Sequence, residues 1–223
     1  MAEPGSKNRA APSVRQTAYE LFQRALLSGR LRPGQMVSQR ELVELMNLSV
    51  GALRELLPRL ESEGLIVVQP QRGILIPAID LPMIRDTFQM RMALEREAVI
   101  SAIRDMPDDT LDAQRKLHVG MIERVALAPD PELLREGQEI DSGFHLLLVR
   151  NSGNVLLQQA YNLNAIRMRL IKLDRITLTE RILPDAFGDH LLVIDAIRAR
   201  DKQAAIDAMD AHIFNARERA LQL

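Results

Sequence analysis

Three of the four histidines of this 223-residue chain are spaced so that they could reach one cation. Asp141 and His145 lie four residues apart in a segment with helical periodicity, and residues at i and i+4 share a helix face. His190 and His212 lie on either side of a short turn at residues 199–202. Antiparallel helices joined by that turn would bring the two histidines level. Three imidazoles and one carboxylate suit zinc, nickel, iron or manganese.

The chemistry of such a site leaves two functional alternatives open. An isolated Asp/His pair is most often a pair of exposed surface residues with no metal, but two further histidines on facing apolar helices favour a metal site. Four protein donors leave open positions on an octahedral ion, for a small carboxylate effector or for an activated water in a metal-dependent enzyme. The sequence contains neither a Gly-rich phosphate loop nor a nucleophile elbow, so we expect no enzyme. Because it has no cysteine, thiol catalysis and Cys-ligated zinc are excluded.

The elements that would position these residues are helices, so the predicted fold class is mainly α. Segments with helical periodicity span residues 82–105, 108–128, 130–151, 153–176, 184–200 and 202–221. Proline lies near the start of four of them, where its missing amide proton costs little. Residues 78–223 therefore predict an all-α bundle.

Residues 14–77 predict a different, smaller unit. Apolar residues recur at three- and four-residue steps from Val14 to Leu27, as on one helix face. Ser38 and Glu41 form a capping box for a second helix, and Ser49 caps a third. Two short β-branched runs joined by a Pro/Gly turn follow, which indicates a β-hairpin. Three helices and a hairpin make a winged helix-turn-helix. Residues 1–13 are expected to form a disordered tail.

The winged helix-turn-helix predicts which residues would face DNA. Its recognition helix places N-terminal residues against base edges in the major groove, and the hairpin tip reaches the flanking backbone. The candidate DNA contacts are Arg40, Ser49, Val50, Gly51, Arg54, Arg72 and Gly73. Residues 1–77 hold ten basic and seven acidic residues, whereas the remainder holds nineteen and twenty-three. Pro58, inside the third helix, predicts either a kink or an early helix end.

Several motifs of the first unit carry a family resemblance. They are Val37-Ser38-Gln39-Arg40-Glu41-Leu42-Val43, Leu48-Ser49, Leu53-Arg54-Glu55, Arg59-Leu60-Glu61-Ser62-Glu63-Gly64-Leu65 and Gln71-Arg72-Gly73. They resemble a GntR-type winged helix, and the helical second half resembles the FCD-type ligand domain of the FadR subfamily. Relatives usually carry Arg or another polar residue and then Thr or Ser after the equivalent of Ser49. Here Val50 and Gly51 stand there, so the operator sequence is expected to differ.

The FCD resemblance also implies site residues in the second half. Its Asp-x3-His, His, His pattern is matched by Asp141, His145, His190 and His212, which are the predicted metal ligands. Arg91 matches a recurring arginine of the first FCD helix and is the main effector candidate, with an ion pair to Glu95 as the alternative. Asn154 and Arg167 are further effector candidates, although Asn154 also suits a helix cap and Arg167 a solvated face. His118 matches nothing and is interpreted as an exposed or partly buried helix residue.

Together these features predict a metal-containing transcriptional regulator, a repressor in the commoner family pattern. It would bind double-stranded operator DNA as a homodimer and respond to a small carboxylate effector. Zinc is the first choice of divalent metal ion, with nickel, manganese or iron as alternatives. No apolar run is long enough to span a membrane and no secretory signal is present, so a cytoplasmic location is expected. The alternatives are the metal-dependent enzyme and a winged helix used only for protein contact.

Overall fold

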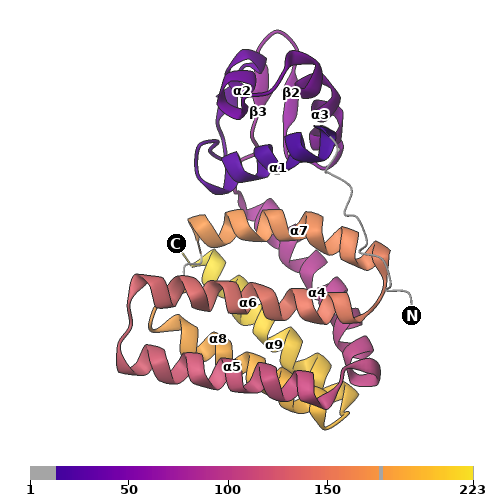
Figure 1. The fold of residues 1–223 in the computed structure, drawn as a ribbon, viewed down its shortest axis with the longest axis vertical. Helices are drawn as coiled ribbons and strands as arrows, with labels where there is room; N and C mark the ends of the chain where they lie inside the picture. Colours follow the sequence, from indigo (N-terminus) through magenta and orange to yellow (C-terminus); the bar gives the residue numbers. More distant parts are fainter. Residues whose placement is uncertain (1–13, 176–177, 223) are drawn as a thin grey trace, which may run out of the picture. The chain divides into compact units, whose positions relative to one another are not determined.

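The computed structural model describes residues 14–175 and 178–222. The predicted tail, residues 1–13, lies outside them. The chain divides into two units, Met1–Ile79 and Asp80–Leu223, each described here by itself (Figure 1). The sequence had placed this boundary between residues 77 and 78.

The first unit contains three helices and three short strands within the described residues. They are α1 (Val14–Leu27), β1 (Met36–Val37), α2 (Gln39–Met46), α3 (Val50–Ser62), β2 (Val67–Gln69) and β3 (Gly73–Leu75). The predicted capping box of α2 is confirmed: the Glu41 amide donates to Ser38 Oγ (3.1 Å), and the Ser38 amide donates to the Glu41 carboxylate (2.6 Å). Asn47 ends α2 in the left-handed conformation, with φ of 50°.

The sheet of this unit has one strand more than the sequence predicted. The hairpin is confirmed as β2 and β3, but β1 also pairs with β3, giving the antiparallel order β1-β3-β2. The sequence analysis did not predict β1, because a two-residue strand is too short to show alternation. In this sheet Val37 pairs with Ile74, and both side chains are buried.

Helix α3 continues through Pro58 to Ser62, so the proline does not end it. The Pro58 side chain is exposed, whereas Leu53, Leu56, Leu57 and Leu60 are buried. This apolar face packs on α1 and α2. The exposed face and the N-terminus of α3 are thereby left to solvent.

The second unit is helical throughout its described residues. Its helices are α4 (Leu81–Asp105), α5 (Asp108–Leu127), α6 (Pro131–Asn151), α7 (Val155–Asp174), α8 (Ile182–Arg198) and α9 (Lys202–Leu221). Each bound lies within two residues of the predicted segment. Side chains of Asp80, Asp130, Asn154 and Asp201 accept hydrogen bonds from the first amides of α4, α6, α7 and α9. The mainly α fold class is confirmed.

Packing of this unit brings distant segments of the chain together. Helices α8 and α9 form an antiparallel pair, α4 packs against α6, α7 and α9, and α5 packs against α6 and α8 (Figure 1). Arg200, in the turn between α8 and α9, has φ of 57° and donates to the carbonyls of Ile103 and Met106 at the end of α4. None of the described helices is long and apolar enough to cross a membrane.

Gly73→Ala is expected to destabilise the first unit by more than about 1 kcal/mol. Gly73 has φ of 125°, and a Cβ built there would lie 2.8 Å from the Val37 carbonyl oxygen, so the β1–β3 pairing must move. Urea unfolding measures the change. The control Gly51→Ala, in a helix with no close neighbour, should leave stability equal or higher. Equal stability of Gly73→Ala and the parent would contradict this steric account.

Candidate functional site

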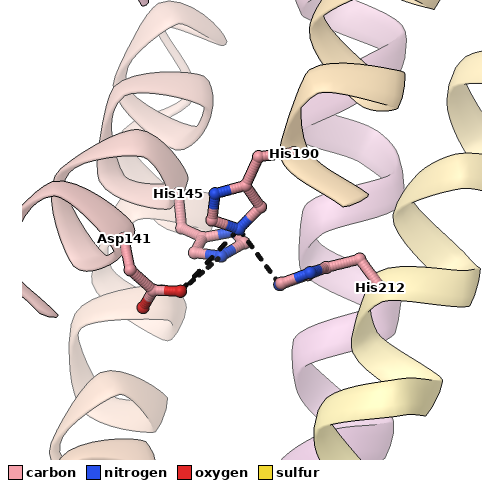
Figure 2. Close-up of side chains that lie close together, drawn as sticks. All are labelled: Asp141, His145, His190 and His212. Carbon is pink, nitrogen blue, oxygen red and sulfur yellow. Dashed lines mark hydrogen bonds and ion pairs between the residues drawn. The ribbon is translucent and has the colours of Figure 1, made fainter. Parts of the chain in front are cut away.

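Asp141, His145, His190 and His212 form one buried cluster in the second unit. Asp141 and His145 come from α6, His190 from α8 and His212 from α9, and Figure 2 shows the four side chains pointing toward one another. One ligand atom from each lies within 4.8 Å of all the others. His190 Nε2 is 3.2 Å from His212 Nε2 and 3.7 Å from Asp141 Oδ1. The structure therefore brings the four predicted metal ligands to one point.

The second ring nitrogen of each of the three imidazoles lies close to another side chain. His145 Nδ1 lies 2.6 Å from Glu95 Oε2, with angles outside those of a good hydrogen bond, and His212 Nδ1 lies 3.6 Å from Asp189 Oδ2. His190 Nδ1 lies 3.0 Å from His118 Nε2. Such outer partners orient metal-bound histidines and set which nitrogen carries the proton.

The electrostatics of the cluster keep its histidines neutral near pH 7. Burial lowers the pKa of His145 to about 4, although the Glu95 carboxylate opposes the shift. Burial also lowers the pKa of His212, and that of His190 well below its ordinary value. Neutral imidazoles keep a lone pair free for a cation.

Asp141 is held ionised despite its burial. Burial alone would raise its pKa, but the positive charges around it, that of Lys172 first and that of Arg91 as well, outweigh this and hold it below the usual range. Lys172 Nζ pairs with Asp141 Oδ2, while Asp141 Oδ1 faces the histidines. An ionised carboxylate, three neutral imidazoles and an outer partner for each imidazole fit a divalent metal ion.

Arg91 and Glu95 border the cluster on α4. Arg91 Nε donates to Glu95 Oε1 (2.7 Å), and Arg91 Nη2 lies 2.6 Å from His145 Nε2 and 3.3 Å from His212 Nε2. Burial would lower the pKa of Arg91, but Glu95 and Asp141 raise it, so the guanidinium is charged. The ion pair with Glu95 is therefore present, and the same guanidinium also reaches the cluster.

A pocket adjoins the cluster between α4, α6 and α7. His145 belongs to both, and Arg91 and Glu95, which border the cluster, also line the pocket. The polar side chains that complete the pocket are Ser142, Tyr161, Asn162, Asn164, Arg169 and Lys172. Of the three predicted effector residues, only Arg91 lines it. The Asn154 side chain instead caps α7, accepting from the amides of Leu156 and Leu157. Arg167 is not among the lining residues, whereas Arg169 is.

His118 corrects the sequence analysis. It was expected to be exposed or partly buried, but its side chain is fully buried and touches His190. The signal was present in α5, where buried Leu111, Met121 and Val125 lie seven residues before and three and seven after it. Periodicity therefore placed His118 on the core face. Glu95 and Asp189 were missed as partners because their roles depend on contacts between helices.

The predicted DNA-facing residues gather around the start of α3 and at the hairpin. Ser49 is the N-cap of α3 and accepts from the Ala52 amide (3.1 Å). Val50, Gly51 and Arg54 are exposed on the first turns of the helix, with Val50 51% exposed. Arg40, on α2, is exposed and pairs with Glu44. These residues are thus free of the core.

The two residues predicted at the hairpin tip differ in their roles. Arg72 is exposed in the turn between β2 and β3. Gly73 starts β3 beneath the Val37 carbonyl, so sheet geometry alone requires a glycine there. A contact to DNA is not needed to explain Gly73.

Comparison with known proteins assigns both units. Residues 14–76 match the model described as bacterial regulatory proteins, gntR family, and residues 86–215, more than half of the chain, match the FCD domain. Among curated relatives, the HTH-type transcriptional repressor RspR of Escherichia coli K12 is 27% identical over 214 residues, covering 94% of this chain and 90% of that protein. The repressor GlaR of the same strain is 28% identical over 200 residues, covering 88% and 90%.

A solved structure supports the fold. The structure of E. coli McbR/YncC matches with a TM-score of 0.68 and 19% identity, covering 92% of this chain and 95% of that one. At this identity the match shows the shared fold alone.

Acidification is expected to destabilise the metal-free protein. The folded state holds the pKa of His145 at about 4, below the unfolded value of 6.5, so the unfolded chain takes up protons first as pH falls. The free energy of unfolding should therefore fall between pH 6.5 and pH 4, by about 2–3 kcal/mol from His145 alone. Urea unfolding at pH 7.5 and 4.5 measures this, and His145→Gln should show a shallower decline. A parent protein equally stable at both pH values would contradict it.

Proposed function

The chain belongs to the GntR family of bacterial regulatory proteins and carries an FCD domain, and from this premise we propose how it regulates transcription. A divalent metal ion on Asp141, His145, His190 and His212 helps to bind a small carboxylate effector. Effector binding alters the affinity of a homodimer for a short palindromic operator in the cytoplasm, where the protein acts as a repressor. The repressor role is supported by RspR and GlaR, which are named as repressors.

The observation that carries this proposal is that the pocket lies directly against the metal-ligand cluster. Arg91, Glu95 and His145 line the pocket, and the His145 imidazole also belongs to the ligand set. A small molecule in the pocket is therefore within reach of both a guanidinium and the metal site. Among zinc, nickel, manganese and iron, zinc is the first choice, because protein zinc sites are commonly built from histidine and carboxylate ligands.

The chain's own residues favour an anionic ligand. Arg91 is charged and buried, and Arg169 and Lys172 add two further basic groups to the pocket. A guanidinium can donate two parallel hydrogen bonds to a carboxylate. A bound divalent metal would supply a Lewis acid for one carboxylate oxygen.

On the DNA side, the exposed start of α3 supports reading of the major groove. Arg54 can contact guanine, and Val50 can contact a thymine methyl group. Two-fold symmetry of a dimer would match two such helices to the halves of a palindrome. Family and relatives favour this regulator over the metal-dependent enzyme that the donor set alone allowed, and over a winged helix used only for protein contact.

Elemental analysis of the purified chain tests the metal site. We expect about one metal ion per chain, lost in His145→Ala and His212→Ala because the remaining donors no longer complete the site. Asp195→Asn, an exposed carboxylate change on the same helix as His190, should keep the metal. Full occupancy in either histidine variant would refute the ligand assignment.

Arg54→Ala is expected to weaken specific operator binding by about 1–3 kcal/mol with the fold unchanged. The operator can be selected from random duplexes and affinity measured by fluorescence anisotropy at fixed salt. Arg24→Ala removes an equal charge from the exposed end of α1 and should cost less, with little dependence on sequence. An unaltered affinity for Arg54→Ala would remove this residue from the interface.

Arg91→Lys tests the effector role while keeping a positive charge beside Glu95. We expect at least a tenfold loss of affinity for whichever member of a panel of small mono- and dicarboxylates raises the melting temperature of the parent. Metal content should stay unchanged. Arg167→Lys, whose side chain is not among the residues lining the pocket, serves as the control. Equal titrations for parent and Arg91→Lys would leave Arg91 as a structural ion pair.

A further inference from the structure

His118 is a buried titratable side chain that the proposed metal and effector sites do not use. It lies on α5, outside the ligand set, and contacts His190 of α8 across the helix interface. Phe144 and Phe187 flank its ring, with centroids 5.2 Å and 4.8 Å away. A fully buried imidazole between aromatic rings needs a hydrogen-bond partner on each nitrogen to offset its lost hydration.

The first partner fixes the tautomer of His118. Its Nδ1 lies 2.7 Å from the carbonyl oxygen of Gln114, one turn earlier on the same helix. A carbonyl oxygen only accepts, so Nδ1 must carry the proton and donate. Because burial between apolar rings disfavours the charged ring, Nε2 of the neutral imidazole is left as an acceptor.

The hydrogen bond with the second partner, His190, sets the tautomer of that residue. His118 Nε2 lies 3.0 Å from His190 Nδ1, and an acceptor there requires a proton on His190 Nδ1. His190 Nε2 then keeps its lone pair. That atom faces the cluster, 3.2 Å from His212 Nε2 and 3.7 Å from Asp141 Oδ1.

We infer that His118 is a positioning residue that holds His190 in its Nδ1–H tautomer through a chain of hydrogen bonds starting at the Gln114 carbonyl. The chain turns the His190 Nε2 lone pair toward Asp141 and His212. The effect of this chain on metal affinity rests on the metal site proposed above, whereas the tautomer of His190 does not depend on it.

This arrangement differs from that of the other two ligand histidines. His145 and His212 have the carboxylates Glu95 and Asp189 near their Nδ1 atoms. A carboxylate in the place of His118 would have to stand between Phe144 and Phe187, where a charge is costly. A neutral imidazole tied to a backbone carbonyl orients His190 without adding that charge.

Three variants separate positioning from packing. His118→Leu removes the acceptor and puts an apolar side chain of similar size in its place. His118→Gln restores an acceptor, because its amide oxygen can stand near the position of the imidazole Nε2. Met121→Ala, a buried change on the same helix, weakens packing without touching the hydrogen-bond chain.

Histidine tautomers are measured first, by long-range ¹H–¹⁵N correlation spectra of the ¹⁵N-histidine-labelled, chelator-treated full chain at pH 7.5. We expect the Nδ1–H form at both His118 and His190 in the parent and in Met121→Ala. His190 should become a tautomer mixture in His118→Leu and return to the Nδ1–H form in His118→Gln. An Nε2–H form of His190 in the parent, or an unchanged His190 in His118→Leu, would overturn the inference.

Zinc affinity is measured next, by competition with a chelating indicator. His118→Leu should bind zinc 10- to 100-fold more weakly, with His118→Gln and Met121→Ala within a few-fold of the parent. Equal loss in His118→Leu and Met121→Ala would assign His118 to packing and overturn the positioning role. A parent that binds no zinc, nickel or manganese would refute the proposed metal site, while the tautomer spectra would still decide the inference.

Discussion

The second unit depends on burying a set of charged and polar side chains together at its centre. Arg91, Glu95, Asp141, His145, His190 and His212 are each at most 4% exposed. Isolated in such a site, a single charge would cost several kcal/mol, but each charge here has an opposite one beside it. Four helices contribute these residues, so a shift of one helix would break buried polar contacts between them, such as that of Arg91 Nη2 with His145 Nε2 or that of His190 Nε2 with His212 Nε2. The cluster therefore fixes the packing of α4, α6, α8 and α9 as well as offering donor atoms.

The arrangement around this centre links ligand chemistry to helix position. Helix α4 carries Arg91 and Glu95, which touch His145 and line the pocket, and it follows directly in the chain after the first unit. An anion that pairs with Arg91 would compete with its present contacts to Glu95 and His145. A small ligand could thereby act on the helix that continues the chain from the DNA-binding unit.

The first unit shows how packing and recognition share one short helix. Leu53, Leu56, Leu57 and Leu60 of α3 are buried, so the remaining face and the capped N-terminus stay exposed. Ser49 supports α3 as its cap, a structural role that would hold in the absence of DNA. Gly73 likewise has a structural reason in the sheet, which leaves Arg54 and Arg72 as residues with no such reason in the core.

The sequence by itself determined the helices, the hairpin and the four cluster residues, because these depend on local periodicity, caps and residue spacing. The capping box of Ser38 and Glu41 and the i,i+4 pair of Asp141 and His145 are local features of this kind. Only the tertiary structure decided that β1 joins the sheet, that Arg169 rather than Arg167 lines the pocket, and that Asn154 serves as a cap outside it. It also decided the partners of the ligand imidazoles, since Glu95, His118 and Asp189 meet them from other helices or faces. Such contacts depend on how helices rotate and pack against one another. The sequence of a single helix shows only which of its faces is buried, as the pattern of α5 does for His118.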